Sequence, residues 1–99
     1  MILHTVNQSP FNNQSFADCL KFCRKGSSIL LIEDGVYAGK KGTEYSALIE
    51  SNNNINFYAL AVDVKARGLT EDLSPAISLI SDREFVDLTV THKSVQSWF

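Results

Sequence analysis

The chain has 99 residues, of which 44% are hydrophobic and 20% are charged, and its formal net charge is −2. This apolar content excludes general disorder, and the length suits one domain with one core over residues 1–99. The charge argues against direct nucleic-acid binding, because neutralising phosphates requires clustered lysine and arginine. The apolar runs are too short for a membrane span. Two cysteines without a signal-peptide pattern predict a reducing, cytoplasmic location.

The first part of the chain predicts a strand followed by a helix. Ile2–Val6 is a short apolar strand. The next helix is expected from Ser15 to about Lys25, because Ser15 and Asp18 have the spacing of a capping box. Gly26 can supply the left-handed residue that ends this helix.

Ser28–Glu33 reads as the second strand, and its run of isoleucine and leucine has no polar face. Such a strand is typical of a parallel sheet covered on both sides by helices. It ends at Glu33, Asp34 and Gly35, where an open α/β sheet normally places its binding crevice. Two carboxylates and one glycine disfavour a nucleotide, whose phosphates would require more glycines and often a lysine. We expect Asp34 to cap the following helix or to make interface contacts instead.

The rest of the chain continues the alternation of helices and strands, which predicts a three-layer α/β/α sandwich with a mostly parallel sheet of four to five strands. In chain order we expect a helical segment in two pieces (Val36–Ala38 and Thr43–Glu50), a strand (Ile55–Leu60), a short helix (Val62–Arg67) closed by Gly68, a strand (Ile77–Ile80) and a helix from Asp82 to about Thr91.

The two cysteines are the first candidates for chemistry. Phe16, Cys19, Leu20 and Cys23 follow helical spacing, which directs both thiols toward the packed face and makes them candidate core residues. The alternative is that Cys19 is catalytic and carries a persulfide, since it lies near the helix N-terminus, whose dipole lowers a thiol pKa. Asp18 beside it has the opposite effect. We expect no metal site, because no further cysteine or histidine cluster has zinc spacing.

The histidines and the last aromatic pair are weaker candidates. His4 and His92 have no neighbouring cysteine or serine in the sequence, so a structural role is expected unless folding brings a nucleophile close. Trp98 and Phe99 form an apolar end that we expect to dock on another surface.

Four blocks in register carry a family resemblance. They are His4–Phe11, Ser28–Tyr37, Ala66–Leu69 and the closing segment Phe85–Val90 with Val95–Trp98. With these blocks the chain resembles the TusB/DsrH family of small sulfur-relay subunits over nearly its whole length.

The resemblance implies one TusB/DsrH-like domain over residues 1–99, with the DsrEFH-like sandwich fold. It implies a cytoplasmic heterohexamer with TusC/TusD-like or DsrE/DsrF-like subunits, in which sulfur passes between cysteines as a persulfide. No cofactor, membrane or direct nucleic-acid contact is expected for this subunit. The destination would be the 2-thio group of wobble uridine in tRNA or, alternatively, dissimilatory sulfur oxidation.

The resemblance also bears on Cys19. The stretch Ser15–Phe22 looks like the DsrH stretch in which a cysteine matches Cys19, which makes Cys19 the candidate catalytic residue of this chain. TusB subunits can lack that cysteine, and the accepting cysteine then belongs to the sister subunit TusD. In that case this chain is a largely non-catalytic subunit. A third hypothesis is a homo-oligomeric structural domain unrelated to sulfur.

Overall fold

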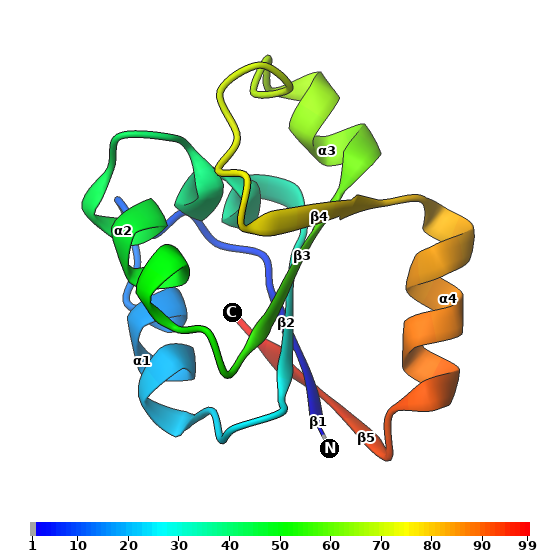
Figure 1. The fold of residues 1–99 in the computed structure, drawn as a ribbon. Coiled ribbons are helices and arrows are strands. Elements are labelled where there is room, and N and C mark those ends of the chain that lie inside the picture. Colours follow the sequence, from blue (N-terminus) through cyan, green and yellow to red (C-terminus); the bar gives the residue numbers. More distant parts are fainter. Residues whose placement is uncertain (1) are drawn as a thin grey trace.

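The computed structural model describes residues 2–99, and they form an α/β fold with five strands (Figure 1). The elements in chain order are β1 (Ile2–Val6), α1 (Ser15–Phe22), β2 (Ser28–Leu31), the 3-10 helix η1 (Glu33–Gly39), α2 (Glu44–Ser51), β3 (Asn56–Leu60), α3 (Ala61–Ala66), β4 (Ile77–Ile80), α4 (Asp82–Thr91) and β5 (Ser94–Trp98).

All five strands are parallel, in the order β4-β3-β2-β1-β5. The register places His4 of β1 between Ile29 of β2 and Gln96 of β5. The predicted sandwich with a mostly parallel sheet is therefore confirmed. In this order β4 and β5 are the edge strands.

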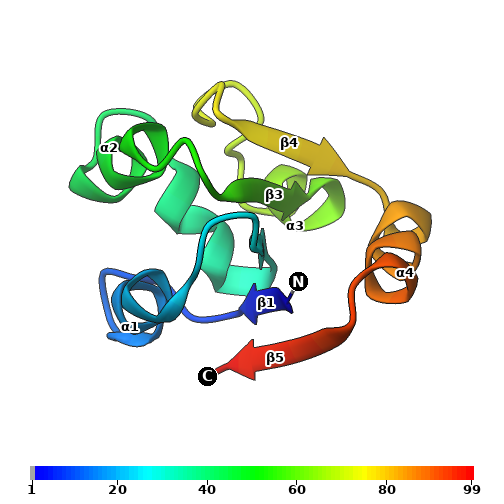
Figure 2. The ribbon, with the colours of Figure 1, turned by 60° about the horizontal axis from the view of Figure 1, so that its bottom comes forward.

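Helices cover the two faces of the sheet unequally. Figures 1 and 2 show α1 and α2 on one side and α4 on the other, with α3 near the carboxyl ends of the strands. The face under α1 and α2 holds the larger hydrophobic cluster, which includes Phe16 and Leu31. The face under α4 holds a smaller cluster of buried residues, which are Leu3, Leu30, Leu60 and Ile80.

Helix α1 differs from its prediction at both ends. Its N-cap is Gln14, without a side-chain cap hydrogen bond, so the predicted capping box of Ser15 and Asp18 is wrong. The helix ends at Phe22, and Cys23 already has an extended backbone. The chain then needs a turn to enter β2, and Gly26 makes that turn with φ +88° rather than closing the helix.

The second strand is shorter than predicted, because the chain turns sharply after it. β2 ends at Leu31, and Glu33 has a left-handed φ of 49° where η1 begins. The predicted cap by Asp34 is wrong, since the N-cap of η1 is Ile32 and Asp34 accepts a hydrogen bond from Arg67 instead.

The position of the fifth strand is not predicted by the sequence pattern. β5 is an edge strand whose first four residues are exposed, so they lack the apolar alternation that marks a half-buried strand. Its pairing with β1 defines it. None of the helices in residues 2–99 combines the length and the apolar character needed to cross a bilayer.

Candidate functional site

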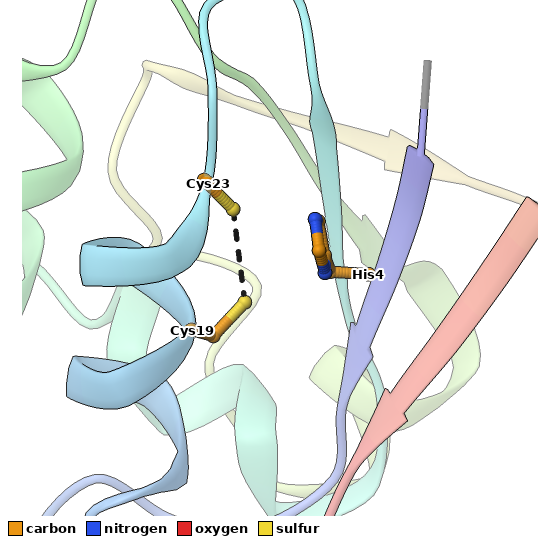
Figure 3. Close-up of side chains that lie close together, drawn as sticks. All are labelled: His4, Cys19 and Cys23. Carbon is orange, nitrogen blue, oxygen red and sulfur yellow. Dashed lines mark hydrogen bonds between the residues drawn. The ribbon is translucent and has the colours of Figure 1, made fainter.

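The fold brings His4 next to both cysteines. β1 turns His4 toward α1, and α1 and its C-cap direct Cys19 and Cys23 back toward the imidazole ring (Figure 3). The two sulfur atoms lie 3.8 Å apart and share a hydrogen bond. Cys19 is fully buried, in agreement with the core interpretation, whereas Cys23 is only half-buried. His4 and the thiols lie on different elements, so no spacing in the sequence predicts that they meet.

Trp98 determines which nitrogen of His4 carries the proton. The Trp98 Nε1–H donates to His4 Nδ1 at 3.1 Å, and this requires a lone pair on Nδ1. The neutral imidazole therefore carries its hydrogen on Nε2. Burial lowers the pKa of His4, which favours the same neutral form. The predicted docking of the chain end is seen for Trp98, which packs on Phe22 at a ring-centroid distance of 5.8 Å, whereas Phe99 stays exposed.

The hydrogen bond between the thiols separates their acidities. The bond to Cys23 and burial both raise the pKa of Cys19, because a charge on this enclosed sulfur would be poorly solvated. The hydrogen bond from Cys19 lowers the pKa of Cys23 against the opposing effect of burial. Of the two thiols, Cys23 is therefore the one that loses its proton more readily, and Cys19 can then donate the hydrogen bond to it.

The same three residues form a set of metal-ligand atoms. One atom of each of His4, Cys19 and Cys23 lies within 4.8 Å of the others, and thiolate with imidazole is a donor set for Zn²⁺ or Cu⁺. Sequence spacing alone could not identify this cluster. However, Nδ1 of His4 already accepts a hydrogen bond from Trp98, and Nε2 is protonated. A metal would have to break that bond, so the arrangement suits a hydrogen-bonded thiol pair better.

A hollow of about 300 Å³ adjoins the cluster and shares His4 with it. It lies near the amino ends of β1 and β2, and its lining residues are Ile2, His4, Phe22, Arg24, Lys25 and Ser27. Arg24 and Lys25 are exposed and follow Cys23 directly in the chain. The hollow therefore combines two cations and an aromatic side chain with His4, which also belongs to the thiol cluster.

Two carboxylates near the carboxyl ends of the strands, those of Asp34 and Asp63, make structural contacts. Asp34 forms an ion pair with Arg67 at 2.8 Å, and the backbone N–H of Glu33 donates to Asp63 at 2.8 Å. These contacts tie η1 to α3. Gly35 is required by packing, because a Cβ there would collide with the backbone carbonyl of β1.

His92 is placed away from this chemistry, at the C-cap of α4. Its Nε2 lies 3.0 Å from the Ser28 hydroxyl, and its Nδ1 lies 2.8 Å from the carbonyl oxygen of Leu88. The contact with Ser28 attaches the end of α4 to the start of β2, and the contact with Leu88 holds the ring on the last turn of α4. This is the structural role expected for a single histidine.

Comparison with known proteins gives consistent results. A family model described as DsrH like protein matches residues 8–95. Protein TusB of Escherichia coli K12 is 42% identical over 99 residues, which cover 98% of this chain and 100% of that protein. Protein TusB of Shigella boydii serotype 18 is 41% identical with the same coverage.

Solved structures share the fold. The ychN protein from E. coli matches with a TM-score of 0.82 and 18% identity, covering 97% of each chain. Protein MTH1491 from Methanobacterium thermoautotrophicum matches with a TM-score of 0.70 and 14% identity, covering 97% of this chain and 96% of that chain. At these identities the likeness concerns the fold alone.

Proposed function

The chain belongs to the TusB/DsrH family of sulfur-relay subunits, and we propose that its complex supplies sulfur for the 2-thio group of wobble uridine in tRNA. The observation that carries the proposal is the 42% identity to TusB, which extends over the full length of that protein. A match of this extent leaves no part of the relative without a counterpart in this chain.

We further propose that the chain works in the cytoplasm within a heterohexamer of TusC-like and TusD-like subunits. Two features support association. The outer side of α4 exposes Val86 at 58% and Val90 at 78%, and exposed apolar side chains favour contact with a partner. β5 is an edge strand, and the free side of such a strand can pair with another chain.

Within this complex we propose a largely non-catalytic role for Cys19. Sulfur transfer requires an accessible thiolate, and Cys19 has no exposed surface and a raised pKa. The alternative is a DsrH-type subunit that carries a persulfide on Cys19 in sulfur oxidation. The observation in favour of this alternative is the Cys23 sulfur atom, which lies 3.8 Å from that of Cys19 and places a second thiol beside it. Cys19 could take part only if α1 moved to expose it.

The test is the 2-thiouridine content of bulk tRNA in a strain that lacks the gene, complemented with wild type or with Cys19→Ser. We expect loss on deletion and rescue by both versions. An unchanged 2-thiouridine content on deletion would overturn the tRNA role and favour sulfur oxidation. Rescue by wild type alone would favour Cys19 as the carrier, provided that the Cys19→Ser complex still assembles.

The proposed assembly is tested separately by co-expression with TusC-like and TusD-like subunits and measurement of the mass of the purified complex. We expect one species containing two copies of each chain. A stable homo-oligomer that ignores both partners would favour the structural domain unrelated to sulfur.

A further inference from the structure

We propose that Cys23, rather than Cys19, is the thiol of this chain that accepts sulfur, and that its donor is an anionic low-molecular-weight persulfide held in the adjoining hollow. The inference rests on the relay function proposed above and names the accepting residue and the class of substrate.

The first support is the geometry of the thiol pair. The two sulfur atoms are 3.8 Å apart, within hydrogen-bond range for sulfur. Of the two cysteines, only Cys23 has exposed surface. Cys19 is enclosed between α1 and the sheet and can act as the donor of this bond. A thiolate on Cys23 would therefore be stabilised by Cys19, and the lowered pKa of Cys23 agrees with this.

The second support is His4, whose ring faces both sulfurs in Figure 3. Because Trp98 occupies Nδ1, the ring offers an N–H at Nε2 rather than a lone pair. A neutral imidazole in this state does not take the thiol proton. It places a neutral polar ring, with one nitrogen atom within 4.8 Å of both sulfur atoms, beside the point where an anion forms during transfer.

The third support is the hollow beside the cluster. Its volume of about 300 Å³ suits a small molecule, and Arg24 and Lys25 supply positive charge at its lining. Cys23 is not itself among the lining residues. The hollow meets the thiol pair at His4, which lines the hollow and lies within 4.8 Å of both sulfur atoms, and Arg24 follows Cys23 directly in the chain. A small persulfide that carries carboxylates matches this charge.

The transfer step is balanced without a further reagent. The Cys23 thiolate attacks the terminal sulfur of a donor R–S–SH and forms a new sulfur–sulfur bond. The bond inside the donor breaks, its electron pair leaves with R–S⁻, and the transferred sulfur keeps its proton as Cys23–S–SH. The hollow then releases the thiolate R–S⁻.

The direct test is incubation of the full purified chain with glutathione persulfide, followed by intact-mass measurement and peptide mapping. We expect a gain of one sulfur atom on the peptide that contains Cys23, and no gain in Cys23→Ser. Sulfur found on Cys19, or no gain on a folded wild-type chain, would overturn the proposal.

The donor role of Cys19 is tested by a pair of variants. Cys19→Ala removes the hydrogen-bond donor, whereas Cys19→Ser retains one. Alkylation of Cys23 is measured against pH. We expect the pH midpoint of the alkylation rate to be higher in Cys19→Ala than in wild type. Below that midpoint Cys23 should react roughly tenfold more slowly than in wild type, because a hydrogen bond to a charged group stabilises the thiolate by about that factor. Cys19→Ser should restore much of the rate. Equal profiles in wild type and Cys19→Ala would overturn this role.

The hollow is tested with two alkylating agents that differ in charge. The measured quantity is the ratio of the reaction rate with anionic iodoacetate to the rate with neutral iodoacetamide. This ratio should be higher in wild type than in R24Q/K25Q, because the cations attract the anion. The matched control is K40Q/K41Q, which removes two exposed lysines from a loop outside the hollow and should leave the ratio unchanged. An unchanged ratio in R24Q/K25Q would overturn the assignment of the hollow.

Sulfur gain on Cys23 and the 2-thiouridine content of tRNA test the accepting residue and the relay function separately. If deletion of the gene lowers 2-thiouridine but Cys23 gains no sulfur, the relay function stands and the role of Cys23 is rejected. If Cys23 gains sulfur but deletion leaves 2-thiouridine unchanged, the accepting residue stands and the tRNA destination is rejected.

Discussion

Helices α1 and α4 lie on opposite faces of the same sheet and are stabilised in different ways. α1 has no side-chain cap at its N-terminus, but it buries Ser15, Phe16 and Cys19 against the larger cluster. α4 has a reciprocal capping box between Ser81 and Glu84, and none of its residues is fully buried.

The difference shows where local and tertiary interactions each determine a helix. Capping and helical periodicity are readable along a sequence, and the predicted bounds of α4, Asp82 to about Thr91, are confirmed. Burial depends on what lies opposite in space, and the predicted N-cap and C-terminus of α1 were both wrong. We infer that tertiary packing contributes most of the stability of α1, whereas local interactions contribute most at α4.

The largest effect is expected from removing the main anchor of α1. Phe16→Ala should lower the free energy of unfolding by about 3–5 kcal/mol, because it leaves a cavity in a fully buried position. Val90→Ala on α4, a position that is 78% exposed, is the matched control and should change it by less than about 0.5 kcal/mol. Urea denaturation of both variants measures the difference. Similar losses would contradict the contrast between the two helices.

The contact between Trp98 and His4 should have the next largest effect. Trp98→Phe keeps an aromatic ring but removes the N–H that donates to His4 Nδ1. We expect a loss of about 1–2 kcal/mol, because a buried acceptor loses its partner. Phe99→Leu, at a position that is 80% exposed, is the control and should be nearly neutral. Thermal unfolding of both variants checks this expectation. An unchanged Tm in Trp98→Phe would show that the hydrogen bond makes no net contribution to stability.

The capping box should account for a smaller effect on the α4 side. Ser81→Ala should destabilise the chain by about 1 kcal/mol, since the N–H of Glu84 loses its acceptor. Gln14→Ala at the N-cap of α1 should have no measurable effect, because that side chain makes no cap hydrogen bond. Equal effects in urea denaturation would remove the distinction between the two helix starts.

The smallest expected effect is a pH dependence that belongs to the α1 face. Burial lowers the pKa of His4 in the folded chain below its ordinary value of 6.5. Between the folded pKa and pH 6.5, the unfolded chain therefore binds a proton at His4 more readily than the folded chain does. Stability contributed by the neutral ring is present above pH 6.5 and is lost as the pH falls through the folded pKa of His4. His4→Gln should lack this component in unfolding curves recorded across that range. An unchanged pH profile in His4→Gln would assign the dependence to other groups.

The sequence by itself determined the sandwich fold, the parallel strands and the family, because apolar periodicity and matched motifs are local patterns along the chain. The burial of Cys19 also followed from helical spacing. Only the tertiary structure decided that His4 and Trp98 meet the two thiols, since these residues are far apart in sequence and come together through the pairing of β1 with β5. It also decided which thiol is half-buried, because α1 ends at Phe22 to let the chain turn into β2, and this leaves Cys23 at the margin of the core.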